Sequence, residues 1–373
     1  MSALLSPLLS ALGPERAHRL TATFGGWLRE HPAGLRLLRA VCARHDPRLV
    51  FEAMGLRFPS PVGVSAGSDR NGLLAPCFEA FGAGFVEVGT VTPRPCGVNS
   101  LPRVVGLGAD DALVQPANVS GVAAPVVAWR LRNGPPLRVP VGVCVGRVAD
   151  HIAADPVDDY VEAVCAVRDV ASFVTLDIAC PDGEDGATFE SDPRRLERLL
   201  DCVRSELPDG YPVLVKLAPD LAWETLRELV NASLGKGIRG FVVANAVRSR
   251  EDLTTPPGQV LAIGPGWLSG RPVRRRANLV MRTLRRHVGS SVTLVGSGGI
   301  FDVFDAIERI EAGADLVTVC TALAYRGPGL LTTLSREVAR MRAPGRQGRV
   351  ERPNPLGRGG DGGISARGAD AAR

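Results

Sequence analysis

The stretch Phe173-Val-Thr-Leu-Asp-Ile-Ala-Cys-Pro181 decides how the rest of the chain is interpreted. Its β-branched and aromatic residues, ended by proline and the turn-forming pair Asp182-Gly183, predict a buried strand. Reactive side chains gather at its end, at Asp177, Cys180 and Asp182. Taken alone, such a cysteine is either a small apolar residue that caps a core strand or a reactive thiol. The ends of the other strands help to distinguish these two interpretations.

Seven further segments have the same apolar, β-rich character, as strands buried on both faces must have. Together with 173–180, the predicted strands are residues 61–67, 85–91, 139–146, 212–219, 240–246, 291–300 and 316–323. Longer helical patterns lie between them, including Asp159–Val170, Pro193–Ser205, Trp223–Leu234 and Val303–Ala312. Eight β/α units in series predict an α/β fold, the closed (β/α)₈ or TIM barrel, whose active site lies at the carboxyl ends of the strands.

In this interpretation the barrel occupies residues 46–342, with a different segment at each end. Residues 1–45 predict a small helical extension, in which an apolar stripe containing Leu4 and Leu8 lies opposite arginines. Such basic amphipathic helices either pack on their own domain or lie on an anionic membrane surface. Residues 343–373 are rich in glycine, proline, arginine and aspartate with few large apolar side chains, and we expect a disordered tail there.

Composition excludes several classes of protein. No run of 18 apolar residues exists, so we expect no membrane-spanning helix. The N-terminus lacks the features of a signal peptide, which predicts a cytoplasmic protein with reduced thiols. The eight cysteines form no Cys-x-x-Cys pair, so we expect neither a disulfide framework nor a metal site. The net charge of +5 is modest, and we expect no nucleic-acid partner.

If the strands close into a barrel, the residues at their carboxyl ends surround one mouth. The glycine-rich turn at Gly298 and Gly299 follows the seventh predicted strand. Barrels commonly hold a phosphate at this position, because glycine lets backbone N–H groups approach a ligand closely. Thr321, at the end of the eighth strand, can add a hydroxyl donor. The pattern therefore predicts a phosphate site.

Lys216 needs an explanation, because the chain has only one other lysine, Lys236, and otherwise uses arginine. It lies inside the apolar run Val-Leu-Val-Lys-Leu, and a buried ammonium group must be paired. One partner would be Asp177 on the neighbouring strand. The other, which we favour, is the electron-rich ring edge of a phosphorylated cofactor. Since no strand-borne Gly-x-Gly-x-x-Gly unit occurs, flavin mononucleotide (FMN) fits better than a dinucleotide.

Several blocks in a fixed order carry a resemblance to a known family: Gly13–Thr21, Met54–Gly63, Val86–Pro95, Val215–Leu221, Leu268–Pro272 and Gly298–Ile300. From the N-terminus to about residue 335, the chain resembles the class 2, quinone-reducing dihydroorotate dehydrogenases. The resemblance implies an FMN enzyme of pyrimidine biosynthesis that oxidises dihydroorotate and passes electrons to a quinone. It also implies that the N-terminal helices rest on the cytoplasmic side of the cell membrane, which favours peripheral membrane association.

The resemblance implies roles for individual residues as well. FMN would be bound by Ala66, Gly67, Thr90, Cys144, Asp177, Lys216, Ala244, Gly270, Gly298, Gly299, Cys320 and Thr321. The substrate would be bound by Arg70, Gln115, Asp182 and Asn245. Cys180 would be the catalytic base, at a position where class 2 enzymes have serine and class 1 enzymes have cysteine. A thiol is the more acidic of the two groups.

The substrate pocket departs from the family pattern at several positions. Asp177 and Asp182 stand where the family has asparagines, and Arg70 stands in place of a lysine. Further departures are Cys144, Ala244, Ala246, Cys320 and a rewritten loop at 114–120. An ionised aspartate only accepts hydrogen bonds and repels a substrate carboxylate. We therefore expect weak turnover of dihydroorotate and a preference for a neutral or donor-bearing ring. The alternatives are an oxidoreductase for another ring substrate and a non-catalytic flavin-binding protein.

Overall fold

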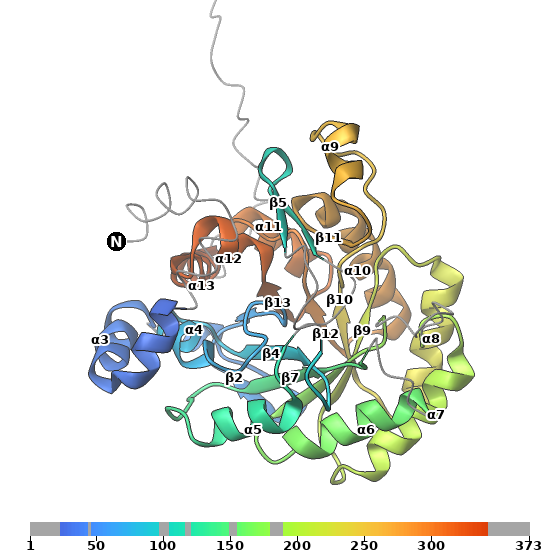
Figure 1. Ribbon diagram of the computed structural model, residues 1–373, viewed down its shortest axis with the longest axis horizontal. Coiled ribbons are helices and arrows are strands. Elements are labelled where there is room, and N and C mark those ends of the chain that lie inside the picture. The colour runs from blue at the N-terminus through green and yellow to red at the C-terminus, as the bar shows by residue number, and fades with distance from the viewer. Residues whose placement is uncertain are drawn as a thin grey trace, which may run out of the picture.

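The computed structural model describes residues 23–43, 46–96, 104–115, 121–148, 155–179 and 189–341. Its centre is a closed barrel of parallel strands in the order β10-β12-β13-β3-β4-β7-β8-β9 (Figure 1). The strands are β3 (Val62–Val64), β4 (Val86–Val91), β7 (Val141–Val145), β8 (Phe173–Asp177), β9 (Val213–Leu217), β10 (Gly240–Val243), β12 (Thr293–Gly296) and β13 (Leu316–Val319). Each lies within one of the eight predicted segments, so the predicted (β/α)₈ barrel is confirmed.

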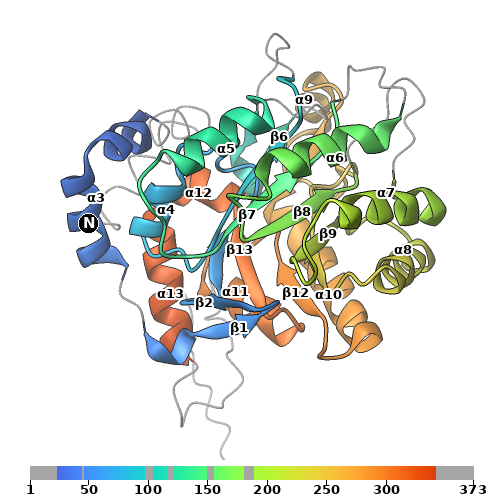
Figure 2. The same cartoon turned by 90° about the horizontal axis from the view of Figure 1, so that it is seen from below.

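Helices surround the barrel and bury their apolar faces against it (Figure 2). They are α4 (Ala75–Ala80), α5 (Ala124–Arg132), α6 (Pro156–Val167), α7 (Pro193–Ser205), α8 (Trp223–Gly235), α10 (Arg274–Val288), α11 (Val303–Glu311) and α13 (Gly329–Met341). In α7, for example, Leu196, Leu199 and Val203 recur at helical spacing and are fully buried. The side chains of Asp155 and Asp192 accept backbone N–H groups and so fix the start of α6 and α7.

The amino-terminal end of the barrel is closed by an apolar cluster. Phe58, Phe85 and Phe173 pack there edge to face, beneath the hairpin of β1 (Phe51–Ala53) and β2 (Leu56–Phe58). Glycine makes room for these rings, since a Cβ at Gly142 would lie 2.1 Å from the ring of Phe173. Because this end is apolar, the polar groups of the barrel interior are found towards the other end.

A three-stranded sheet, absent from the predicted strands, forms from excursions after β4 and β10. It consists of β5 (Val105–Leu107), β6 (Ala112–Gln115) and β11 (Trp267–Gly270), with β6 in the middle, and β5 and β11 are visible near each other in Figure 1. The short helix α9 (Pro257–Ala262) precedes β11, and α12 (Thr321–Arg326) follows β13. Gly270 ends β11 with a φ of 107°, where a Cβ would lie 2.3 Å from the carbonyl oxygen of Asp111.

The described part of the N-terminal extension is helical, over residues 23–30 and α3 (Pro32–Cys42). Leu28 and Leu35 pack against Cys77 and Ala80 of α4. Arg39 also forms an ion pair of 2.6 Å with the buried Glu79. This extension therefore packs on the barrel, while its exposed apolar side chains, namely Phe24, Trp27, Leu37 and Val41, face away from the core.

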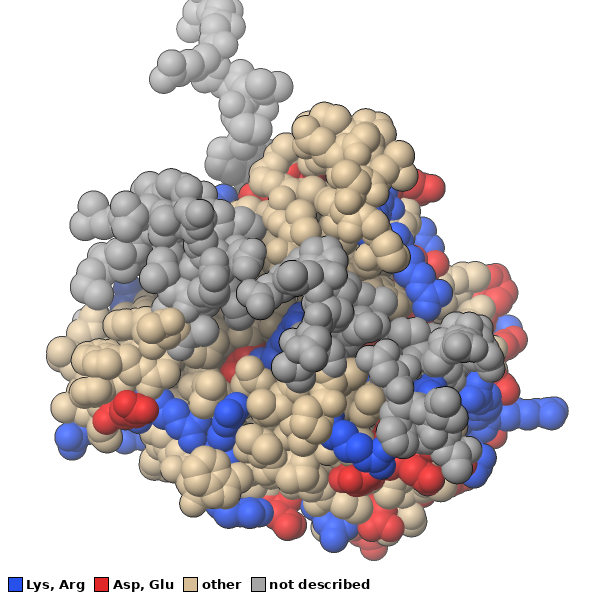
Figure 3. Space-filling model, viewed as in Figure 1, with Lys and Arg blue, Asp and Glu red and all other residues tan. Residues whose placement is uncertain are grey.

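The remaining predictions about the chain ends concern residues that lie outside the described ranges. The leucine stripe of residues 1–22, the block Gly13–Thr21 and the tail 343–373 lie outside them. Within the described part of the chain, no helix is long and apolar enough to cross a membrane. Figure 3 shows acidic and basic side chains interspersed on one face of the molecule, without a continuous basic field among the described residues.

Candidate active site at the barrel mouth

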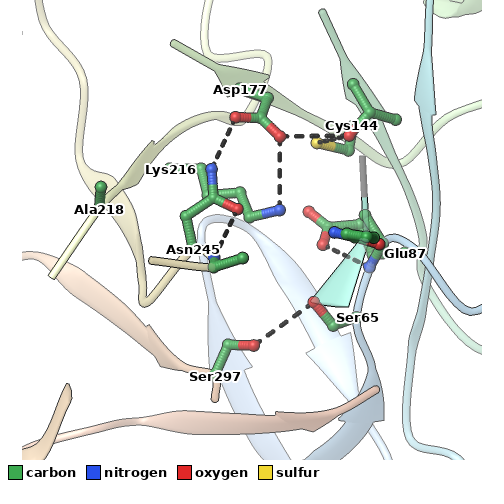
Figure 4. Close-up of polar contacts among 12 residues, drawn as sticks. Ser65, Glu87, Cys144, Asp177, Lys216, Ala218, Asn245 and Ser297 are labelled. Atoms are coloured by element: carbon green, nitrogen blue, oxygen red, sulfur yellow. Dashed lines mark hydrogen bonds and ion pairs between the residues drawn. The ribbon is translucent and has the colours of Figure 1, made fainter. Parts of the chain in front are cut away.

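A buried ion pair lies at the carboxyl ends of β8 and β9 (Figure 4). Asp177 and Lys216 are register partners on these neighbouring strands, and the Lys216 Nζ lies 3.5 Å from the Asp177 Oδ2. Asn245 donates its side-chain N–H to the Asp177 Oδ1 (2.8 Å), and the Thr90 hydroxyl donates to Oδ2 (3.2 Å). The ion pair that the sequence offered as one alternative is therefore present, and Asp177 accepts from three neighbouring groups.

Lys216 is charged although only 6% of its surface is exposed. Burial by itself lowers the pKa of an ammonium group, but the negative charges around Lys216, with Asp177 the strongest, raise its pKa above the ordinary value. Glu87 of β4 is one of these and is itself buried. Its Oε2 accepts the Ala66 N–H (3.0 Å), and its Oε1 has no partner among the described residues. The Lys216 ammonium group thus lies close to the buried carboxyl groups of Asp177 and Glu87.

Two cysteines and a pair of serines line the same region. Burial, together with the charges of Glu87 and Asp177, raises the pKa of the Cys144 thiol well above its ordinary value although Lys216 opposes this, so Cys144 is a neutral thiol. Cys320 lies opposite Gly67, where a Cβ would be 3.2 Å from the Cys320 Sγ and where φ is 104°. The hydroxyls of Ser65, which follows β3, and Ser297, which follows β12, lie 3.5 Å apart (Figure 4).

The predicted phosphate turn has free donors. Gly298 and Gly299 have φ values of 83° and 74°, and neither backbone N–H has a partner among the described residues. A Cβ at Gly299 would lie 2.5 Å from the Cβ of Arg274 at the start of α10. Thr321 donates its hydroxyl to Ser269 of β11 (2.9 Å), beside Gly270. Free N–H groups on a glycine turn are suited to an anion such as a phosphate.

The structure places most of the predicted site residues at this mouth. Ala244 follows β10 and lies against Gly298, where a Cβ would be 3.9 Å from its own Cβ. Arg70, in the loop after β3, donates to the Gln115 Oε1 (2.9 Å). Asn245 contacts Asp177 as described above. The predicted base Cys180 and the predicted substrate ligand Asp182 lie outside the described residues.

Other residues of the site were not predicted. Glu87 was missed although it lies in the apolar run Phe-Val-Glu-Val, the same signal that identified Lys216. Glu190 follows the loop after β8 and carries no comparable signal. It is buried, and its Oε1 accepts the Ala218 N–H (3.1 Å). Burial raises the pKa of Glu190 to about 7, and the nearby carboxylates of Asp177 and Asp220 add to this shift.

No group of His, Cys, Asp and Glu side chains in the described ranges could hold a metal ion. Hydrogen-bond donors, the Lys216 ammonium group, carboxyl groups and thiols line this mouth. Such a set can bind a polar ring and an anionic group without a metal.

Comparisons with known proteins give a consistent result. A family model described as dihydroorotate dehydrogenase matches residues 48–341. Two similar relatives are named dihydroorotate dehydrogenase (quinone). The one from Thermosynechococcus vestitus is 33% identical over 342 residues, which cover 89% of this chain and 94% of the relative. The one from Thermobifida fusca is 36% identical over 339 residues, with 89% and 90% covered.

Solved structures show the same similarity. The crystal structure of a ligand-free DHODH from Eimeria tenella matches with a TM-score of 0.74 and 27% sequence identity, covering 86% of this chain and 94% of that chain. The structure from the same organism in complex with ferulenol also has a TM-score of 0.74, at 26% identity, and covers 87% of this chain and 91% of that chain.

Glu190 makes the stability of the protein depend on pH. Its pKa rises from about 4.5 in the unfolded chain to about 7 in the folded protein, so the folded state binds more protons between these values. The free energy of unfolding should therefore fall as the pH rises from about 4.5 to 7, by up to about 3 kcal/mol from this group. Glu190→Gln should leave stability near pH 4.5 unchanged and raise it at pH 8, as measured by urea unfolding. Equal effects at both pH values would contradict the assignment.

Proposed function

The chain belongs to the dihydroorotate dehydrogenase family, and we propose that it is an FMN-dependent oxidoreductase that oxidises dihydroorotate and reduces a quinone. The observation that carries the proposal is the combination of two features at one barrel mouth. The turn at Gly298 and Gly299 offers unpaired N–H groups, and Lys216 supplies a buried positive charge. A phosphorylated flavin requires both an anion site and polar groups for its ring.

The residues present fit FMN. The turn at Gly298 and Gly299, together with Thr321, would hold the phosphate, since the backbone N–H groups of the two glycines have no partner among the described residues. Lys216, Thr90 and the loop at Ala66 and Gly67 would line the ring, together with Cys144, Asp177, Ala244, Gly270 and Cys320. When bound, FMN supplies the hydride acceptor for the reaction.

The protein's own part in the reaction is to bind the ring and remove a proton. We propose Cys180 as the base that takes a proton from one ring carbon, while hydride leaves the adjacent carbon and a double bond forms. Arg70, Gln115, Asp182 and Asn245 would bind the substrate. Asn245 also donates a hydrogen bond to Asp177 (2.8 Å), and this bond fixes the orientation of the Asn245 side-chain amide.

A second candidate is an oxidoreductase for a more neutral ring, and the observation that favours it is the excess of carboxyl groups at the mouth. By the family resemblance Asp177 stands at the position of an amide, and Glu87 lies nearby. Lys216 offsets the charge of Asp177 directly at 3.5 Å, which reduces the repulsion of an anionic substrate. Dihydroorotate therefore remains the first substrate to test.

For the quinone we propose access along the N-terminal helices, at a peripheral membrane contact on the cytoplasmic side. The side chains of Trp27 and Leu37 are 51% and 69% exposed on this extension. Apolar groups on a basic helical segment are suited to the boundary of an anionic bilayer.

The two lysines provide a matched test of FMN binding. Purified protein should contain one FMN per chain, and Lys216→Met should lose most of it, because the buried charge that faces the ring is removed. Lys236→Met should retain it, since Lys236 is on the surface in an ion pair with Asp201 (2.6 Å). The measurement is the flavin absorbance per chain after gel filtration. Equal flavin content in both variants would contradict the proposed site.

Dihydroorotate should bleach the flavin absorbance of the wild-type protein under anaerobic conditions, which tests the activity directly. Asp177→Asn should raise the affinity for dihydroorotate on the order of tenfold, because one negative charge near the substrate carboxylate is removed and the charge of Lys216 is offset less fully. Stopped-flow reduction at increasing dihydroorotate concentrations gives this affinity. Bleaching by a neutral ring analogue but not by dihydroorotate would favour the second candidate.

Exposed apolar side chains on the N-terminal extension should contribute to the binding of the protein to membranes. Leu37→Gln should weaken binding to anionic vesicles about fivefold, since burying part of a leucine side chain is worth about 1 kcal/mol. Leu261→Gln, at a 79% exposed leucine of α9, is the control and should bind as the wild type does. Co-sedimentation with vesicles measures both. If the two variants bind equally, the extension does not form the contact.

A further inference from the structure

Arg309 of α11 is a completely buried arginine beneath the Gly298–Gly299 turn. None of its surface is exposed, and its side chain crosses the end of β12, where a Cβ at Gly296 would lie 2.4 Å from the Arg309 Cγ. Its guanidinium donates through Nη2 to the Gly298 carbonyl (2.8 Å) and through Nη1 to the Ser297 carbonyl. Arg309 thus contacts the turn from the side of the outer helix.

The remaining donors of Arg309 also contact neutral acceptors. Nε donates to the Asn278 Oδ1, and Nη1 lies 3.4 Å from the Val243 carbonyl oxygen. In the part of the chain that the structure describes, no carboxylate lies within ion-pair distance of Arg309. The nearby Asp305 is instead paired with Arg274 (2.5 Å) and Arg271 (3.6 Å). A buried positive charge without a direct counter-ion is costly, so an anion elsewhere would stabilise it.

The contacts of Arg309 determine where the free N–H groups of the turn point. The peptide bonds after Ser297 and Gly298 are trans, and in a trans peptide the C=O and the following N–H point in opposite directions. Both carbonyls are directed towards Arg309, and the Ser297 carbonyl also accepts the Ala244 N–H (3.2 Å) beside it. The N–H groups of Gly298 and Gly299 therefore point inward, towards the mouth of the barrel.

We propose that Arg309 is a positioning residue for the phosphate group of the cofactor. Its guanidinium binds two carbonyls, so that two N–H donors converge on the phosphate. Its buried positive charge lies on the far side of the turn and balances the negative charge of the phosphate. It does not touch the phosphate itself. A charge in this dry position is screened much less than one on the surface, so it acts across the turn.

The inference rests on the proposed FMN function, and its specific consequence is phosphate selectivity. FMN and riboflavin differ only in the phosphate group. If Arg309 acts through the phosphate, its loss should weaken the binding of FMN far more than the binding of riboflavin. If Arg309 only connects α11 to β10 and β12, its loss should weaken the binding of both flavins by the same factor.

The experiment measures dissociation constants of FMN and riboflavin on the full-length chain after flavin removal, by quenching of flavin fluorescence. In Arg309→Met the FMN affinity should fall by at least about tenfold, and the riboflavin affinity by less than about twofold. Arg309→Lys keeps a charge but cannot hold both carbonyls, so its selectivity should be intermediate. Arg286→Met removes the same charge from an exposed position of α10 and should retain the wild-type ratio.

Each outcome has a distinct meaning. Equal losses for both flavins in Arg309→Met or Arg309→Lys would overturn the positioning role while leaving the proposed function intact. Wild-type protein that binds neither flavin, or that does not prefer FMN, would overturn the proposed function and this inference together. If Arg309→Met does not fold, the ratio in Arg309→Lys decides, and an unchanged ratio there would reject the proposal.

Discussion

The ion pair between Lys216 and Asp177 is the interaction on which the arrangement of the barrel mouth depends. It exists because β8 and β9 pair in a register that sets these two residues side by side. Asn245 and Thr90 bind the same carboxylate, so the ends of four strands or strand-end loops are linked through one group. Burial raises the pKa of the neighbouring Cys144 thiol so far that it stays neutral, although Lys216 of the pair opposes this shift. A buried pair of this kind is weak evidence for stability but strong evidence for a defined geometry.

Positive charge is placed at the mouth in two different ways. Lys216 points into the barrel and is balanced by carboxylates, whereas Arg309 reaches the mouth only through the peptide groups of Ser297 and Gly298. The first group can act on a ring that lies over the barrel. The second acts on whatever the N–H groups of the turn bind. The two halves of a phosphorylated flavin would thus meet different kinds of positive charge.

The sequence predicts the barrel well, because strands buried on both faces are recognisable as continuous apolar runs. It predicts the three-stranded sheet of β5, β6 and β11 poorly, since these short strands lie in excursions without a periodic pattern. Lys216 was identified as a buried charge, but the choice between its two partners needed the register of β8 and β9, which no local pattern encodes. Glu87 satisfied the same criterion and was overlooked. In the sequence, Arg309 looks like any arginine on the polar face of an amphipathic helix. Only the packing of the folded chain reveals that it is buried.

The aromatic cluster of Phe58, Phe85 and Phe173 has a consequence for how such a protein can evolve. It concentrates tight apolar packing at the end of the barrel opposite the mouth. An exchange of an amide, carboxylate or thiol group at the mouth would therefore lie far from the packing that most tightly constrains side-chain volume. A lineage with this architecture can alter the chemistry it presents to a ligand while the scaffold that carries it persists.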